Sequence, residues 1–380
     1  MSPPRRGTPD FLLLFLTFLL VCFGLAMVFS ASSMTQSYIR DDPWYYTVRQ
    51  AEFIAMGTVG MFVCMNMHYL SLKKWVIPFF LFVVALLFLV PIIGREVNGA
   101  KSWFYIGPFG IQPSEFAKLA VIMYLAVLIS KKDEKFRSFR NGLLPALVVL
   151  AFVSGLIMLQ PDAGSTMVLL MGASVIIFVG GSNLKHIFFL GTAAASAACL
   201  LLSFYLLTNH QSYRIDRFTT FLDPFADKLG KGYHLVQSLY AFGHGGVFGA
   251  GFGQSIQKLH YLPAAHNDFI FAIIGEELGF IGSSLFLIVY LLFIWRGLIV
   301  ALRSTDMFAT LAGVGIVSML GIQALINIGG VTGSIPLTGV TLPLISYGGS
   351  SIITTLVSLG ILLSISREQN KPDKETTKRA

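Results

Sequence analysis

The sequence predicts an all-α membrane protein with about ten transmembrane helices, and three observations lead to this fold class. The chain has 380 residues, of which 55% are hydrophobic and only 12% are charged. Its apolar residues gather in repeated runs of about 17 to 25 residues, the length that a helix needs to cross a bilayer. Charged residues or Gly and Pro bound each run. Helices satisfy their backbone hydrogen bonds internally, so they are the expected form of these runs.

We expect ten spans in all. The first run follows Arg5 and Arg6 and ends in Ser30-Ala31-Ser32, a pattern that resembles a signal peptide with its cleavage site. Because many further spans follow, we interpret this run as an uncleaved first span. The predicted spans cover residues 11–29, 51–66, 75–93, 114–130, 143–159, 165–179, 187–207, 268–295, 307–328 and 350–365.

The basic residues predict how the spans are oriented. Seventeen of the 27 Lys and Arg residues lie on one side of the membrane if there are ten spans, including those of the N-terminal segment, of the cluster 131–140 and of the tail from Arg367 onward. By the positive-inside rule, both termini are therefore cytoplasmic. The net charge of +8 is thus explained by topology, which removes a nucleic-acid partner from consideration. We predict a transmembrane domain over residues 1–366 and a polar, disordered cytoplasmic tail over 367–380. The short outer segments hold only Arg40, Arg49, Arg95 and Lys101.

Two outer loops are candidates for a functional site. One covers residues 94–113, and the other covers 208–267, between the seventh and eighth spans. The second loop is far longer than a helix connection needs, and long loops of this kind are usually functional. Asp268 follows it directly and lies at the outer membrane face in this topology, close to His266 and about two turns before Glu276 and Glu277. A carboxylate placed there is expensive, which favours a functional role, although Asp268 could also cap the helix that begins at this point.

The long outer loop contains two further patterns. Arg214 and Arg217 are three residues apart and would form a fork for a phosphate or diphosphate on a helix, or would reach toward lipid headgroups. Residues 243–253 are rich in glycine but match neither the dinucleotide fingerprint nor the P-loop. We therefore expect a backbone that closely approaches either another helix or an elongated substrate.

The loop 94–113 and the end of the chain carry the remaining candidates. Lys101 lies near Trp103, which could anchor the loop at the membrane interface or stack against a sugar. Glu115 and Lys118 are spaced to pair on one helix, and this pair could be purely structural. Asp162 could simply cap the sixth span. Prolines, glycines and hydroxyls break the helical pattern over residues 335–351, which predicts a re-entrant or cavity-lining segment beside the site.

Together these residues resemble the SEDS family of shape, elongation, division and sporulation proteins, typified by FtsW, RodA and SpoVE. The matching stretches include GAKSWFYIGPFGIQPSEFAKL, LQPDAGS, YRIDRFTTFLDP, LHYLPAAHNDFIFAIIGEELGFIG and INIGGVTGSIPLTGVTLPLISYGGSS. The long match around Asp268 looks closer to the FtsW and SpoVE branch. The chain departs from the usual family pattern at Ala163, Ser165, Phe225, Ala264 and Asn267.

The resemblance implies a peptidoglycan glycosyltransferase that polymerises lipid II outside the cytoplasmic membrane. It implies a class B penicillin-binding protein as partner, among divisome, elongasome or sporulation proteins, and Asp268 as the essential carboxylate. No tightly bound cofactor is expected, although Mg²⁺ or Mn²⁺ could assist. The candidate substrate-binding residues are Lys101, Trp103, Arg214, Arg217, Gln237, His266, Ser346, Gly348, Gly349 and Ser350. Rival interpretations are a lipid II flippase or ion-coupled transporter, because charges and a broken helix lie at membrane depth, and a non-catalytic scaffold.

Overall fold

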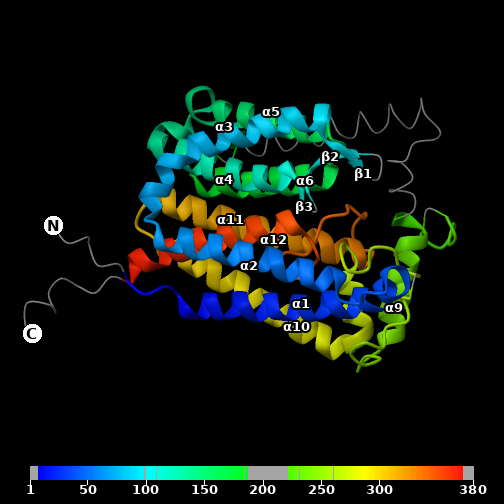
Figure 1. Ribbon diagram of the computed structural model, residues 1–380. Helices are drawn as coiled ribbons and strands as arrows, with labels where there is room; N and C mark the ends of the chain where they lie inside the picture. The colour runs from blue at the N-terminus through cyan, green and yellow to red at the C-terminus, as the bar shows by residue number, and fades with distance from the viewer. Residues whose placement is uncertain are drawn as a thin grey trace, which may run out of the picture.

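The helices of the protein lie side by side in a bundle (Figure 1). The computed structural model describes residues 7–97, 100–107, 109–183, 185–186, 221–230, 232–259 and 261–370. Within these ranges, seven helices are long and apolar enough to cross a membrane. The start of helix α1 (Phe11–Arg40) lies beside the end of helix α12 (Gly349–Gln369). Three strands and α9 (Tyr233–Gly245) lie at the opposite end of the bundle. The predicted all-α membrane fold is confirmed in these features.

Nine of the ten predicted spans fall on described helices, and the seventh, 187–207, lies outside the described residues. Helix α1 continues without a break through Ser30-Ala31-Ser32 to Arg40. Helix α6 has 17 residues and is shorter than the usual membrane crossing. The bounds of the other helices are α2 Tyr45–Asn66, α3 Tyr69–Ile93, α4 Pro113–Lys132, α5 Leu144–Met158, α6 Ala163–Val179, α10 Ile270–Leu302 and α11 Met307–Val331.

Three helices form the centre of the bundle. Most side chains of α4, α11 and α12 are buried, whereas most of α3 faces outward. Helix α12 packs along α2, and α11 packs against α4, α6 and α10. Small residues permit these close approaches. A Cβ atom at Gly24 would lie 2.5 Å from the carbonyl oxygen of Leu344, and one at Gly360 would overlap the backbone of Met61.

The loop 94–113 contains a small antiparallel sheet, which the sequence analysis did not predict. Its strands are β1 (Arg95–Val97), β2 (Ala100–Ile106) and β3 (Phe109–Ile111), in the order β1-β2-β3. Trp103 of β2 stands opposite Arg95 of β1. Two of the strands have only three residues, too short for the alternation of polar and apolar residues to reveal them.

The cytoplasmic end of α12 lies further along the chain than predicted. The expected boundary between residues 366 and 367 falls inside the helix, which continues to Gln369. The guanidinium of Arg367 explains the extension, because its Nε donates to the carbonyl oxygen of Gly7 at 3.0 Å. The rest of the predicted tail, from residue 371, lies outside the described residues.

Candidate active site

Asp268 lies in the turn directly before α10 and is half-buried. Helix α10 begins at Ile270 and its N-cap residue is Phe269, so Asp268 lies one residue before the N-cap position that the sequence analysis considered for it. The carbonyl oxygen of Asp268 accepts a hydrogen bond of 2.8 Å from Nδ2 of Asn327. Its carboxylate faces the backbone of Gly339, where a Cβ atom would lie 3.5 Å from Oδ2. The main chain therefore sets where this carboxylate projects.

Residues 332–348, which we name the outer segment, connect α11 to α12 without forming a helix. This agrees with the break predicted from the prolines and glycines of residues 335–351. Irregular backbone at membrane depth requires partners for its polar groups, and buried amide side chains supply them here. Nδ2 of Asn327 donates to the carbonyl oxygen of Val340 at 2.7 Å. Gln50 of α2 receives the Gly348 amide at 3.3 Å and donates to the Ser346 carbonyl oxygen at 3.3 Å.

Glu115 and Lys118 form the ion pair that their spacing predicts, with 2.8 Å between Nζ and Oε1. The Lys118 side chain is only 1% exposed, so its charge is compensated inside the protein. Nζ also donates to Oε1 of Gln323 at 2.9 Å, and Nε2 of Gln323 donates to the carbonyl oxygen of Thr341 at 3.1 Å. The ion pair thus supports the outer segment from α4 through α11.

Ser350 joins the small sheet to the start of α12. Its Oγ accepts a hydrogen bond of 2.9 Å from the amide of Gln112. Asp162 lies beside this junction, because its Oδ2 accepts bonds from Oγ of Ser114 at 2.9 Å and from Nε2 of Gln112 at 3.1 Å. Oδ1 of Asp162 accepts the Ser165 amide at 2.9 Å, which confirms that Asp162 caps α6.

The other candidate residues of the sequence SYGGSS, residues 346–351, make contacts that hold the local fold. Oγ of the buried Ser346 accepts the Leu342 amide at 2.8 Å, and Gly349 lies directly against the ring of Phe53. Gly348 is the N-cap residue of α12. These positions therefore shape the outer segment, and Ser346 and Gly349 are buried.

His266 belongs to an aromatic cluster next to Asp268. Its ring lies 4.2 Å from the ring of Tyr46 and 5.7 Å from that of Tyr347, measured between centroids. The carbonyl oxygen of His266 accepts the Tyr347 amide at 2.9 Å. Burial lowers the pKa of the His266 imidazole to about 4, because the charged form would lose its hydration. His266 is therefore neutral near pH 7.

Gly279 interrupts α10 with a backbone conformation of φ 67° and ψ −168°, a local break inside the predicted span 268–295 that the sequence analysis did not include. The glycine-rich loop supplies the hydrogen bonds that the break removes. The amides of Ala250 and Gly251 donate to the carbonyl oxygens of Glu276 and Glu277 at 2.9 and 3.0 Å. In return, residues 280 and 281 donate to the carbonyl oxygens of residues 246 and 247. The loop therefore approaches a helix, one of the two predicted alternatives.

The two glutamates after Asp268 hold this loop against α10. Glu276 accepts hydrogen bonds from the Ile256 amide at 2.8 Å and from the hydroxyl of Ser255, and its Oε1 lies 2.9 Å from Nδ1 of His244. Glu277 pairs with Nζ of the buried Lys258 at 2.8 Å. Both carboxylates are buried, so they serve the architecture of the outer loop.

The remaining candidate substrate-binding residues lie on the small sheet, on α9 or outside the described residues. Lys101 is exposed on β2, and Trp103 is half-buried beside Gly110. Gln237 is half-buried on α9, which contacts the end of α11 because Oγ of its neighbour Ser238 donates to the carbonyl oxygen of Val331 at 2.7 Å. Arg214 and Arg217 lie outside the described residues. No group of three or more His, Cys, Asp and Glu side chains in the described ranges is placed to hold a metal.

The sequence analysis missed three amides that organise the site, Gln50, Gln323 and Asn327. Gln50 lies near the start of α2 beside Arg49, whereas Gln323 and Asn327 lie inside the otherwise apolar helix α11. A polar side chain in such a run is costly in a membrane unless it has a partner, and that signal was available. Oδ1 of Asn327 is buried and accepts no hydrogen bond from the described residues.

Comparisons with known proteins agree with this arrangement. Residues 10–371 match the FtsW/RodA/SpoVE family model, described as "Cell cycle protein". The chain is 45% identical to stage V sporulation protein E of Bacillus subtilis over 96% of its length and 98% of the relative. It is 39% identical to a probable peptidoglycan glycosyltransferase FtsW of Geobacter, over 94% of its length and 96% of that protein. The expected likeness to the FtsW and SpoVE branch is thereby confirmed.

Two solved structures share the fold. A chain from a study of polymerization and crosslinking by a peptidoglycan synthase complex superimposes with a TM-score of 0.78 at 32% identity, covering 96% of this chain and 99% of that one. The rod shape determining protein RodA of Thermus thermophilus gives a TM-score of 0.68 at 30% identity, covering 96% and 98%.

Proposed function

Because the chain belongs to the FtsW/RodA/SpoVE family, we propose that Asp268 is the general base of a peptidoglycan glycosyltransferase. The protein is a multi-pass protein of the bacterial cytoplasmic membrane, and it polymerises lipid II into glycan strands on the outer face. The observation that supports the role of Asp268 is its position. Its half-buried carboxylate faces Gly339 of the outer segment, at the end of the bundle that carries the sheet and α9.

The reaction needs one base and one leaving group. The carboxylate of Asp268 takes the proton from the 4-hydroxyl of the acceptor N-acetylglucosamine, whose oxygen then attacks the anomeric carbon of the donor sugar. The bond from that carbon to the diphosphate breaks, and undecaprenyl diphosphate leaves with the electron pair. One displacement inverts the anomeric centre, so the mechanism requires no second carboxylate as nucleophile.

The diphosphate needs positive charge as it leaves. Lys118 is paired with Glu115 inside the bundle, which leaves the exposed Lys101 as a candidate, together with Arg214 and Arg217. A divalent cation, Mg²⁺ or Mn²⁺, would neutralise the same charge when it is supplied with the substrate. Trp103 and Gln237 would then contact the sugars.

Glycan strands must be crosslinked to form a wall. The structurally similar chain belongs to a peptidoglycan synthase complex that couples polymerization to crosslinking. We therefore propose a class B penicillin-binding protein as the partner of this chain, within a division, elongation or sporulation assembly. This partner would supply the transpeptidase.

The test compares the purified protein with its Asp268→Asn variant, each with a class B penicillin-binding protein, lipid II and Mg²⁺ or Mn²⁺, by gel separation of glycan strands. Wild type should form polymer and the variant none, although it remains folded and inserted. Asp306→Asn is the matched control, because Asp306 caps α11 through the Ala309 amide at 3.0 Å and Asn caps equally well. Polymer from the Asp268 variant at near wild-type rate would refute the mechanism. Polymer from neither protein would favour the flippase, which a lipid II translocation assay detects.

A further inference from the structure

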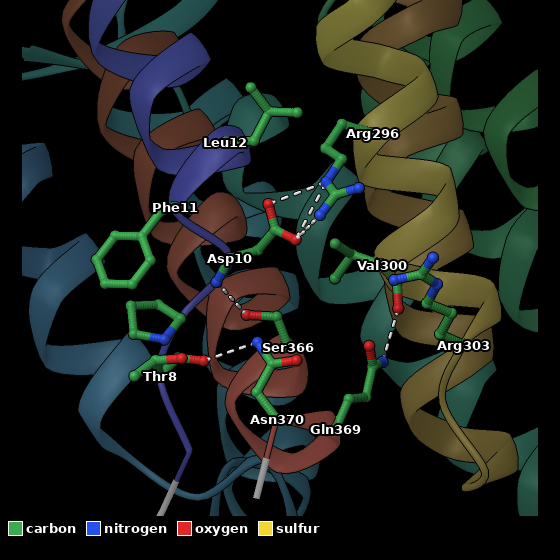
Figure 2. A pocket seen from close by; sticks show the side chains of 11 residues that line it. Thr8, Asp10, Phe11, Leu12, Arg296, Val300, Arg303, Ser366, Gln369 and Asn370 are labelled. Carbon is green, nitrogen blue, oxygen red and sulfur yellow. Dashed lines mark hydrogen bonds and ion pairs between the residues drawn. The ribbon is translucent and has the colours of Figure 1, made fainter.

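A cavity of about 290 Å³ lies at the cytoplasmic end of the bundle, far along the helices from Asp268. Three segments that are distant in sequence line it (Figure 2). They are residues 8–12 at the start of α1, the end of α10 with Arg296 and Arg303, and the end of α12 with Ser366. The candidate active site uses none of these residues.

Asp10 and Arg296 form an ion pair in the wall of this cavity. Nη2 of Arg296 lies 2.6 Å from Oδ2 of Asp10, and Nε lies 3.1 Å from both carboxylate oxygens. Asp10 also caps α1 through the Leu13 amide at 2.9 Å, and its own amide donates to Oγ of Ser366 at 3.0 Å. The charge of Asp10 is therefore fully engaged, while Nη1 of Arg296 has no acceptor among the described residues.

Arg303 gives the cavity its excess positive charge. It follows the last residue of α10, its side chain is exposed, and no described residue binds its guanidinium. Asp10 compensates Arg296 alone, so one positive charge remains uncompensated in the lining. Two guanidinium groups with free N–H donors around one cavity suit an anion with several oxygens, such as a phosphate.

The edge of the same cavity is apolar. Phe11 is 65% exposed and Leu12 is 47% exposed, and both line the cavity, while Leu302 next to Arg303 is 61% exposed. Side chains of this kind on a membrane helix face acyl chains. The lining therefore combines guanidinium groups with an apolar surface that faces lipid. A ligand with an anionic head group and an apolar chain would use both.

We propose that this cavity binds the phosphate headgroup of an anionic phospholipid of the inner leaflet. Arg303 and Nη1 of Arg296 donate to the phosphate oxygens, and an acyl chain lies along Phe11 and Leu12. The bound lipid connects the start of α1 to the ends of α10 and α12. Because it binds only the folded form, it raises the free energy of unfolding by mass action. Free phosphate shares the headgroup chemistry but cannot use the apolar edge.

The test measures thermal unfolding of the purified protein in neutral detergent while a phospholipid is titrated. Phosphatidylglycerol should raise the unfolding temperature, whereas phosphatidylcholine and inorganic phosphate at equal concentration should not. Arg303→Gln should weaken the apparent affinity for phosphatidylglycerol about fivefold, the contribution typical of one basic residue near an anionic membrane surface. Arg137→Gln is the matched control, because Arg137 is an exposed cytoplasmic cation outside the cavity, and it should keep wild-type affinity.

Three results would overturn the proposal. The first is an Arg303→Gln variant with the same affinity for phosphatidylglycerol as the wild type. The second is an equal loss in Arg137→Gln, which would indicate general surface attraction. The third is a full stabilisation by inorganic phosphate, which would make the ligand a free anion. Native mass spectrometry of the same samples counts the retained lipid and is independent of glycosyltransferase activity.

Discussion

The buried ion pair between Lys258 and Glu277 gives the sharpest stability prediction. The side chain of Lys258 is 3% exposed and that of Glu277 is fully buried, with 2.8 Å between Nζ and Oε1. Oγ of Ser30 donates to both carboxylate oxygens at 2.6 and 2.8 Å, and Nζ of Lys258 lies 3.1 Å from the same hydroxyl. The three groups connect α1, the outer loop and α10 across 247 residues of sequence.

Replacing Lys258 by Met leaves the Glu277 carboxylate buried without its cation. Removing one partner of a buried pair costs about 3–5 kcal/mol, because the remaining charge keeps its desolvation penalty. The Ser30 hydroxyl offsets only part of this cost, since one hydrogen bond to a charged group contributes about 1.5–3 kcal/mol. We therefore expect Lys258→Met to lower the free energy of unfolding by about 3 kcal/mol or more.

The double variant distinguishes an unpaired charge from lost packing. Adding Glu277→Gln to Lys258→Met removes the buried charge and keeps an acceptor for Ser30, so the double variant should be more stable than Lys258→Met alone. Equilibrium unfolding in mixed micelles with increasing dodecyl sulfate measures the free energy of unfolding of both variants. Lys131→Met, at an exposed cytoplasmic lysine, is the matched control. A cost below about 1 kcal/mol for Lys258→Met, or strictly additive costs in the cycle, would refute the reasoning.

Two further predictions concern the break in α10 and the aromatic cluster. Gly279→Ala should destabilise the protein by more than about 2 kcal/mol, because only glycine tolerates this backbone region and a Cβ atom would overlap Gly249. The same assay should show almost no change for Gly155→Ala, where an added Cβ atom would have no neighbour within 4 Å. His266 has a pKa lowered to about 4, so the unfolded chain binds its proton first as the pH falls below 6.5, and stability is lost toward pH 4. Between pH 7 and 5 the wild type should lose about 1–2 kcal/mol more than His266→Phe, and equal losses in the two proteins would contradict this.

Much of the bundle was predictable because a membrane requires long apolar helices. The runs that predicted spans fall on described helices wherever the structure covers them. The Glu115 and Lys118 pair followed from helical spacing, and the irregular outer segment followed from its prolines and glycines. These features depend on residues that are close in sequence, so local rules suffice for them.

The break at Gly279 could not be predicted from its own neighbourhood. Most residues that follow it in α10 are apolar, and a single glycine inside a helical pattern is tolerated. The break becomes favourable only because the glycine-rich loop about 30 residues earlier returns the lost backbone hydrogen bonds. The same limit applies to Lys258, whose partners on α1 and α10 come together only in the folded chain.

The outer segment explains how the fold can present a carboxylate at the membrane surface while its own backbone stays satisfied. Neutral amides hold the segment, which avoids burying additional charge beside Asp268. Asn327 binds the carbonyl oxygens of both Asp268 and Val340, so one side chain fixes the catalytic turn and the segment it faces. Gln323 continues this link to the ion pair of α4 through Lys118. The precision of the proposed base therefore depends on buried polar contacts among α4, α10 and α11, which must form before substrate arrives.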